Sequence, residues 1–112
     1  SVLNRIYQYA DSGITPDFID HVITELVSEQ EPVYQNYYAS LTETQAGLIV
    51  AIAKEGVVAT PLAHQFITHH QLKATSSVRT ALKTLIDRQM VYDRPDGYVV
   101  YDRFFGLWLA RL

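Results

Sequence analysis

The fold is decided by residues 76–101, which read SSVRTALKTLIDRQMVYDRPDGYVVY. In the first half of this stretch, apolar residues recur every three or four positions, which predicts a helix that starts after Thr75 or Ser76 and ends near Gln89. The second half has two short runs rich in β-branched and aromatic residues, separated by the turn sequence Arg94-Pro-Asp-Gly. A helix followed directly by a β-hairpin is therefore predicted.

Two further helices are predicted before this stretch. Thr42-Glu-Thr-Gln fits a capping box, in which the Thr and Gln side chains bond free backbone amides, and Gly56 marks the end of that helix. Thr60-Pro61 is a second start signal, for a helix that ends near His70. Three helices and a hairpin over residues 42–101 are the plan of a winged helix, a helix-turn-helix variant. The predicted fold class is mainly α with a small β-hairpin.

Residues 1–40 are predicted to be a helical linker that packs on the winged-helix domain of residues 41–112. One helix is expected to end at Asp11-Ser-Gly, and a second to run from Thr15-Pro16 to about residue 29. A short third helix carries an aromatic stripe in acidic surroundings, which favours helix packing over base stacking. The stripe consists of Tyr34, Tyr37 and Tyr38.

Composition restricts the classes of function. The 112 residues, 48% hydrophobic and 19% charged, suit one packed domain. The absence of cysteine excludes disulfides and thiolate zinc sites and suits a cytoplasmic protein. No apolar run approaches the roughly 20 residues of a membrane span. Because the chain begins with Ser1 and its single methionine is Met90, we expect a segment cut from a longer protein.

Charge is unevenly distributed along the chain. The net charge is −3, yet residues 73–103 hold six basic and four acidic side chains, whereas residues 1–60 hold two basic and eight acidic ones. Because phosphate contacts dominate affinity for nucleic acid, any polyanion is expected to bind the second half.

One face of the predicted third helix is the candidate contact surface. Its polar side chains recur at intervals of three and four residues, opposite the apolar stripe. In a DNA-binding interpretation its cations meet base edges or phosphates, and an arginine in the hairpin turn reaches an adjacent phosphate. A solvated or protein-docking face explains the same pattern, because several aspartates lie nearby. The candidate residues are Lys73, Ser76, Arg79, Thr80, Lys83 and Arg94.

The C-terminal helix supplies a second candidate surface. Phe104, Phe105 and Trp108 recur at helical intervals, as core residues do, and they become a docking site for the next domain or a second copy if the helix is exposed. No catalytic, cofactor or metal site is predicted. His64, His69 and His70 lack the spacing of four residues that aims two imidazoles at one ion, and no nucleophile motif is present.

Three segments carry a family resemblance. Residues 41–56, 76–85 and 98–109 resemble the C-terminal winged-helix region of prokaryotic AAA-type and STAND-type P-loop ATPases, and residues 14–40 are similar to the segment that joins the ATPase lid to that region. The resemblance implies a parent protein whose ATPase core binds ATP and Mg²⁺. The glycines of this chain form no phosphate-binding loop, so no ATP-site residue is carried over.

The sequence therefore predicts a non-catalytic module that couples nucleotide state to binding of DNA or protein. Its partners would be its own ATPase core together with duplex DNA or a protein, and its oligomeric state is left open. The alternative is a free-standing winged-helix transcription regulator. A phosphate-binding loop upstream in the same reading frame would distinguish the first from the second.

Overall fold

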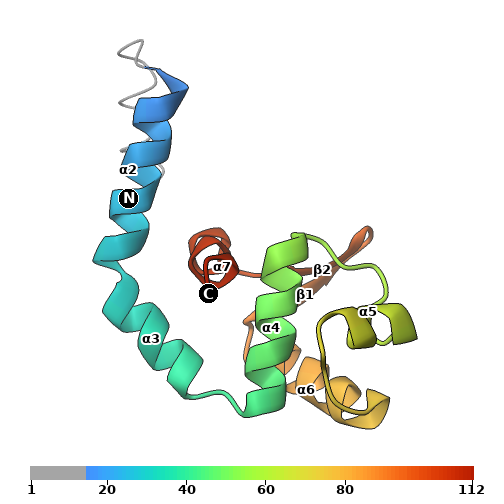
Figure 1. The fold of residues 1–112 in the computed structure, drawn as a ribbon. Helices are drawn as coiled ribbons and strands as arrows, with labels where there is room; N and C mark the ends of the chain where they lie inside the picture. The colour runs from blue at the N-terminus through green and yellow to red at the C-terminus, as the bar shows by residue number, and fades with distance from the viewer. Residues whose placement is uncertain (1–14) are drawn as a thin grey trace.

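The computed structural model describes residues 15–112, which form six helices and one two-stranded sheet (Figure 1). The elements in chain order are α2 (Pro16–Glu29), α3 (Glu31–Ala39), α4 (Glu43–Glu55), α5 (His64–His69), α6 (Thr75–Asp87), β1 (Val91–Arg94), β2 (Gly97–Val100) and α7 (Arg103–Ala110). The predicted mainly α fold with one β-hairpin is confirmed. The helix expected to end at Asp11-Ser-Gly lies outside the described residues.

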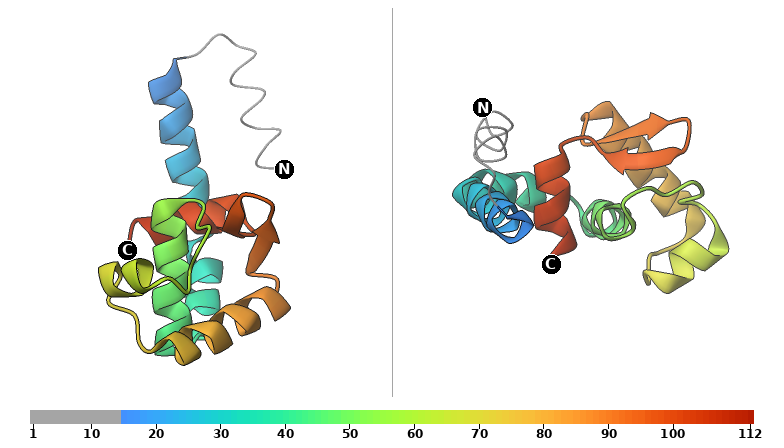
Figure 2. Two further views of the ribbon diagram at one scale, coloured as in Figure 1. Left: turned by 90° about the vertical axis from the view of Figure 1, so that its right-hand side faces the viewer. Right: turned by 90° about the horizontal axis from the view of Figure 1, so that it is seen from above.

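Helix α4 is the central element, with α6 and α7 packed against it (Figures 1 and 2). Its side chains Leu48, Ile49 and Ile52 are fully buried. The predicted capping box fixes its start, because the Gln45 amide donates to Thr42 Oγ1 at 3.2 Å and the Thr42 amide donates to Gln45 Oε1 at 3.0 Å. Burial of this helix on several sides makes it the framework on which the other elements are placed.

Helices α2 and α3 form an arm that rests on α7 (Figure 1). Tyr34 of α3 is only 5% exposed, and its ring centroid lies 5.3 Å from that of Phe105 and 6.0 Å from that of Trp108. Tyr38 meets Trp108 edge to face at 6.0 Å. The packing interpretation of the aromatic stripe is confirmed for these two tyrosines, which attach the arm to the rest of the molecule.

Two helix starts differ from the prediction. Helix α5 begins at His64, three residues after Pro61, because the Ala63 amide donates to the Thr60 carbonyl at 3.1 Å and closes a turn around Pro61. Proline suits the second position of a turn as well as the first position of a helix, so the signal has two structural meanings. Helix α6 begins at Thr75 after Ala74, and no side chain caps it.

The hairpin has the predicted turn and an additional partner. Val91 pairs with Val100 and Arg94 with Gly97, so the connection is the two-residue turn Pro95-Asp96. Val58, in the segment between α4 and α5, forms a single bridge to Tyr98, with backbone N–O distances of 3.0 and 2.8 Å. A one-residue bridge has no periodic pattern, so the sequence did not predict it. The hairpin is thereby attached to the segment that precedes α5.

No helix among residues 15–112 has the length and apolar character needed to cross a membrane.

Candidate nucleic-acid interface

Helix α6 separates its side chains into a buried face and a solvent face. Val78, Leu82 and Leu85 are buried in the core with Ala81, which is 3% exposed. The side chains at Ser76, Arg79, Thr80 and Lys83 are all exposed. The predicted polar face therefore lies in solvent. Helix α6 itself lies in the lower part of the view in Figure 1.

Within the described part of the chain, the two cations on this face have no acidic partners. Neither Arg79 nor Lys83 forms an ion pair or a side-chain hydrogen bond with any other residue in the range 15–112. Between them, the Thr80 hydroxyl donates to the Ser76 carbonyl at 3.1 Å and keeps its lone pairs available. Both positive charges and one hydroxyl acceptor are thus accessible to a ligand.

A shallow hollow of about 400 Å³ adjoins this face. The first turn of α4 lines one side of it with Thr42, Thr44 and Gln45, and the first turns of α6 line the other with Ser76 and Thr80. The hollow offers short hydroxyl and amide groups and no formal charge. Such groups can position a phosphate backbone, although they carry little of the affinity.

Lys73 has a carboxylate partner. Its Nζ lies 3.6 Å from Glu43 Oε2, and the two side chains are 60% and 86% exposed. Glu43 stands in the first turn of α4, where the helix dipole favours a negative charge. The carboxylate of Glu43 therefore partly offsets the positive charge that Lys73 brings to this surface.

Arg94 is bound by two hydrogen bonds to the carboxylate of Asp96, a residue of the hairpin turn. Its Nε donates to Asp96 Oδ1 at 2.9 Å, and Nη2 donates to Asp96 Oδ2. These bonds, assisted by a hydrogen bond with Tyr92, raise the pKa of Arg94, and the guanidinium holds the pKa of Asp96 below its ordinary value. The predicted phosphate contact at the turn is thus already occupied by an anion of the same chain.

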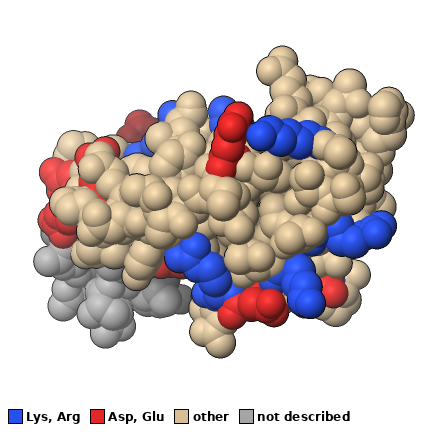
Figure 3. All heavy atoms as spheres, turned by 90° about the horizontal axis from the view of Figure 1, so that it is seen from below, with Lys and Arg blue, Asp and Glu red and all other residues tan. Residues whose placement is uncertain are grey.

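The surface around α6 is only slightly basic. Residues 41–112 carry eight basic and six acidic side chains, whereas residues 15–40 carry five acidic side chains and no Lys or Arg. In Figure 3 the Lys and Arg side chains on this side of the molecule are scattered, and Asp or Glu side chains lie beside several of them. Such a surface does not provide strong, salt-resistant binding of a polyanion.

A family model described as a probable winged helix domain matches residues 32–111, well over half of the chain. The chain belongs to this family. In the winged helix, α4, α5 and α6 are the three helices and the β1–β2 hairpin is the wing. Winged-helix domains typically bind nucleic acid and are generally non-catalytic. No curated protein and no solved structure matches the sequence.

Two of the three residues proposed for docking on α7, Phe105 and Trp108, are buried. Phe105 and Trp108 are 3% and 9% exposed, because the α2–α3 arm covers them through Tyr34 and Tyr38. Phe104 also packs against the core. A docking role for these three residues stays a prediction, and in this structure the α2–α3 arm occupies the aromatic face of α7.

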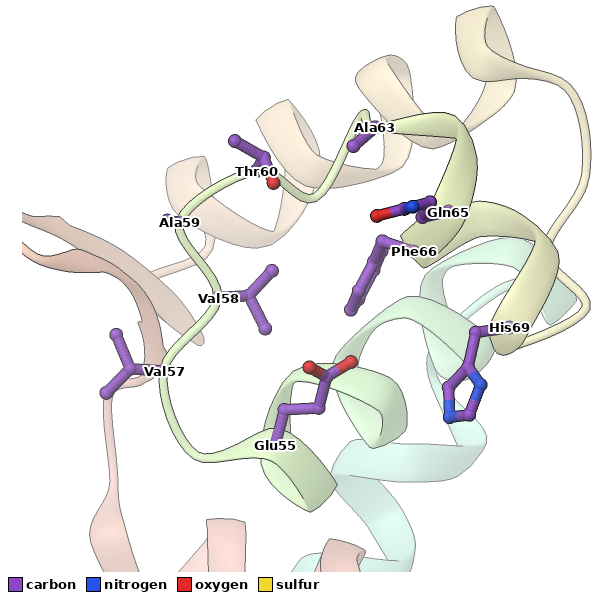
Figure 4. A pocket seen from close by; sticks show the side chains of 9 residues that line it. All are labelled: Glu55, Val57, Val58, Ala59, Thr60, Ala63, Gln65, Phe66 and His69. Carbon is purple, nitrogen blue, oxygen red and sulfur yellow. The ribbon is translucent and has the colours of Figure 1, made fainter.

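A second hollow, of about 410 Å³, lies between the end of α4 and α5 (Figure 4). Glu55 and Phe66 point into it, and His69 borders it. His70 Nε2 contacts the Glu55 carboxylate and ties α5 to α4 across fifteen residues, a contact that no sequence signal indicated. In the described part of the chain, no three His, Cys, Asp or Glu side chains gather as metal ligands would.

Proposed function

We propose that this winged helix binds duplex DNA through α6, and that it serves as the non-catalytic module of a larger AAA-type or STAND-type ATP-binding protein. The observation that carries the first part is the solvent face of α6, where Arg79 and Lys83 have no ion-pair partner among residues 15–112 and lie beside two hydroxyl groups. A helix fits the major groove, from which arginine and lysine side chains can reach the flanking phosphates.

The number of available cations sets the strength of this interaction. Each neutralised phosphate contributes about 0.9 to the slope of log affinity against log salt concentration, so two contacts give a slope of about −2. Binding of that kind is weak and is lost as salt rises. A module with such a surface gains useful affinity when a neighbouring domain or a second copy adds contacts, which supports its assignment to a larger protein.

The ATP-binding parent rests on the resemblance of residues 41–56, 76–85 and 98–109 to the C-terminal region of those ATPases. In such a protein, ATP and Mg²⁺ would be held by the upstream core, and the winged helix would transmit the nucleotide state to DNA. The reading frame upstream of this segment tests the assignment. A strand, a glycine-rich loop with Lys and Ser or Thr, and a helix would support it, whereas their absence would favour a free-standing regulator.

Salt-dependent titration of a fluorescent duplex tests the DNA contact. Arg79→Ala/Lys83→Ala should weaken binding and reduce the salt slope by about 2 relative to the unmodified chain. The matched control is Lys54→Ala/Arg103→Ala, which removes the same charge from exposed positions on α4 and α7. The control should change the slope little. Equal losses in both double variants, or no loss in the first, would contradict a DNA site on α6 and favour protein docking.

A further inference from the structure

The wing carries very little usable positive charge. Residues 91–100 contain one basic side chain, Arg94, and two acidic ones, Asp93 and Asp96. The guanidinium of Arg94 donates to both carboxylate oxygens of Asp96, so the planar fork that would bind a phosphate is filled. A phosphate at the wing would therefore meet an occupied cation and an adjacent negative charge.

The backbone of the wing holds this ion pair in place. Arg94 pairs with Gly97 in the β ladder, so Asp96 is the second residue of the turn that joins them. Pro95 between the two partners has a fixed φ angle, which lowers the conformational entropy lost when they pair. The pair is local and preformed, and it does not depend on a distant element.

We infer that Asp96 masks Arg94, so that duplex DNA is held through α6 while the wing makes no phosphate contact. This inference rests on the proposed function and restricts it, because it assigns the interface to one helix and makes Asp96 a residue that sets affinity. An exposed ion pair contributes little to stability, so it can be removed without unfolding the domain. Replacing Asp96 by asparagine keeps the turn, because Asn is also favoured there.

The test is a cycle of four chains in salt titrations with the same fluorescent duplex: unmodified, Arg94→Ala, Asp96→Asn and the double variant. Arg94→Ala should bind as the unmodified chain does, because its cation is masked. Asp96→Asn should steepen the salt slope by about 0.9 and raise affinity about threefold or more at roughly 50 mM salt, because one phosphate contact is gained. The double variant should lose this gain.

Three outcomes would overturn the inference. The first is a shallower slope for Arg94→Ala alone, which would mean that Arg94 reaches phosphate despite Asp96. The second is an equal gain for Asp96→Asn in the presence and absence of Arg94, which would mean that Asp96 acts by long-range repulsion only. Arg79→Ala/Lys83→Ala is titrated in parallel, and if it has no effect, the proposed function fails. The third outcome, identical binding by all four wing chains, rejects the masking of Arg94 alone.

Discussion

Arg79 and Arg94 are both arginines of the winged helix, but their neighbours give them different chemistry. Arg79 stands on a helix whose adjacent turns present Ser76 and Lys83, whereas Arg94 is followed two residues later by a carboxylate at hydrogen-bond distance. At the scale of the residue, the ligand-binding capacity of a cation depends on the nearest anion. The formal charge total of the chain does not contain this information.

The Arg94–Asp96 pair predicts a measurable pH dependence. Because the guanidinium lowers the pKa of Asp96 from 3.8, the carboxylate should titrate below that value, and Arg94→Ala should return it toward 3.8. The small contribution of the pair to stability is present above pH 3.8 and is lost as pH falls through the lowered pKa of the folded state. Carboxyl chemical shifts recorded against pH check this. An unchanged Asp96 titration in the variant would show that the pair does not form in solution.

At the scale of the element, caps decide where the helices begin. The Thr42 capping box was predicted from four residues, because both of its hydrogen bonds are local. The start of α5 was placed wrongly, because Thr60-Pro61 suits a turn as well as a helix and the choice depends on the Ala63 amide. Local signals thus predicted the elements, and they failed where one signal serves two conformations.

Two threonines give a matched test of the caps. Thr42→Ala removes a hydroxyl that accepts from the Gln45 amide, so the free energy of unfolding should fall by about 1 kcal/mol. Thr60→Ala should change it by less than about 0.5 kcal/mol, because the Thr60 side chain caps nothing. Urea denaturation followed by circular dichroism measures both. Equal effects would show that Thr42 does not act as a cap.

Two glycines test the attachment of the wing. At Gly97, which has a φ of 141°, an added Cβ would lie 2.7 Å from the Val58 carbonyl oxygen, so Gly97→Ala should destabilise the domain by about 2 kcal/mol or more. At Gly106, inside α7, the nearest atom is 3.5 Å away, and Gly106→Ala should stabilise it by up to about 1 kcal/mol. Thermal unfolding of the two variants should therefore shift in opposite directions. A stable Gly97→Ala chain would contradict the Val58 bridge.

At the scale of the whole molecule, aromatic packing joins the arm to the winged helix. The sequence showed that Tyr34, Phe105 and Trp108 are apolar and periodic, but not which surfaces they share, because that pairing joins segments about seventy residues apart. The same limitation applies to the Val58–Tyr98 bridge and to the pairing of Lys73 with Glu43. Of the candidate site, the exposed face of α6 could be predicted from helical periodicity, whereas the occupied state of Arg94 and Lys73 could not.

Tyr34 tests this junction. Tyr34→Ala should lower the free energy of unfolding by about 3 kcal/mol, because a buried aromatic side chain is removed, whereas Tyr34→Phe should preserve stability at neutral pH. Burial, together with the nearby Asp102 and Tyr37, raises the pKa of Tyr34 above 10.0. The stability that the protonated tyrosine contributes is therefore present below pH 10 and is lost as pH rises through the raised pKa. Tyr34→Phe should therefore unfold less readily than the unmodified chain in alkali. Identical alkaline unfolding of the two chains would contradict the raised pKa of Tyr34.

The backbone bridge between Val58 and Tyr98 has a mechanical consequence. Because the two residues exchange both of their amide–carbonyl hydrogen bonds, a force that bends the wing is transmitted to the segment leading into α5. The tip of the hairpin can swing only by breaking these bonds or by displacing α5 with it. A partner that binds the hairpin and displaces it will consequently strain the segment before α5, and the reverse also holds.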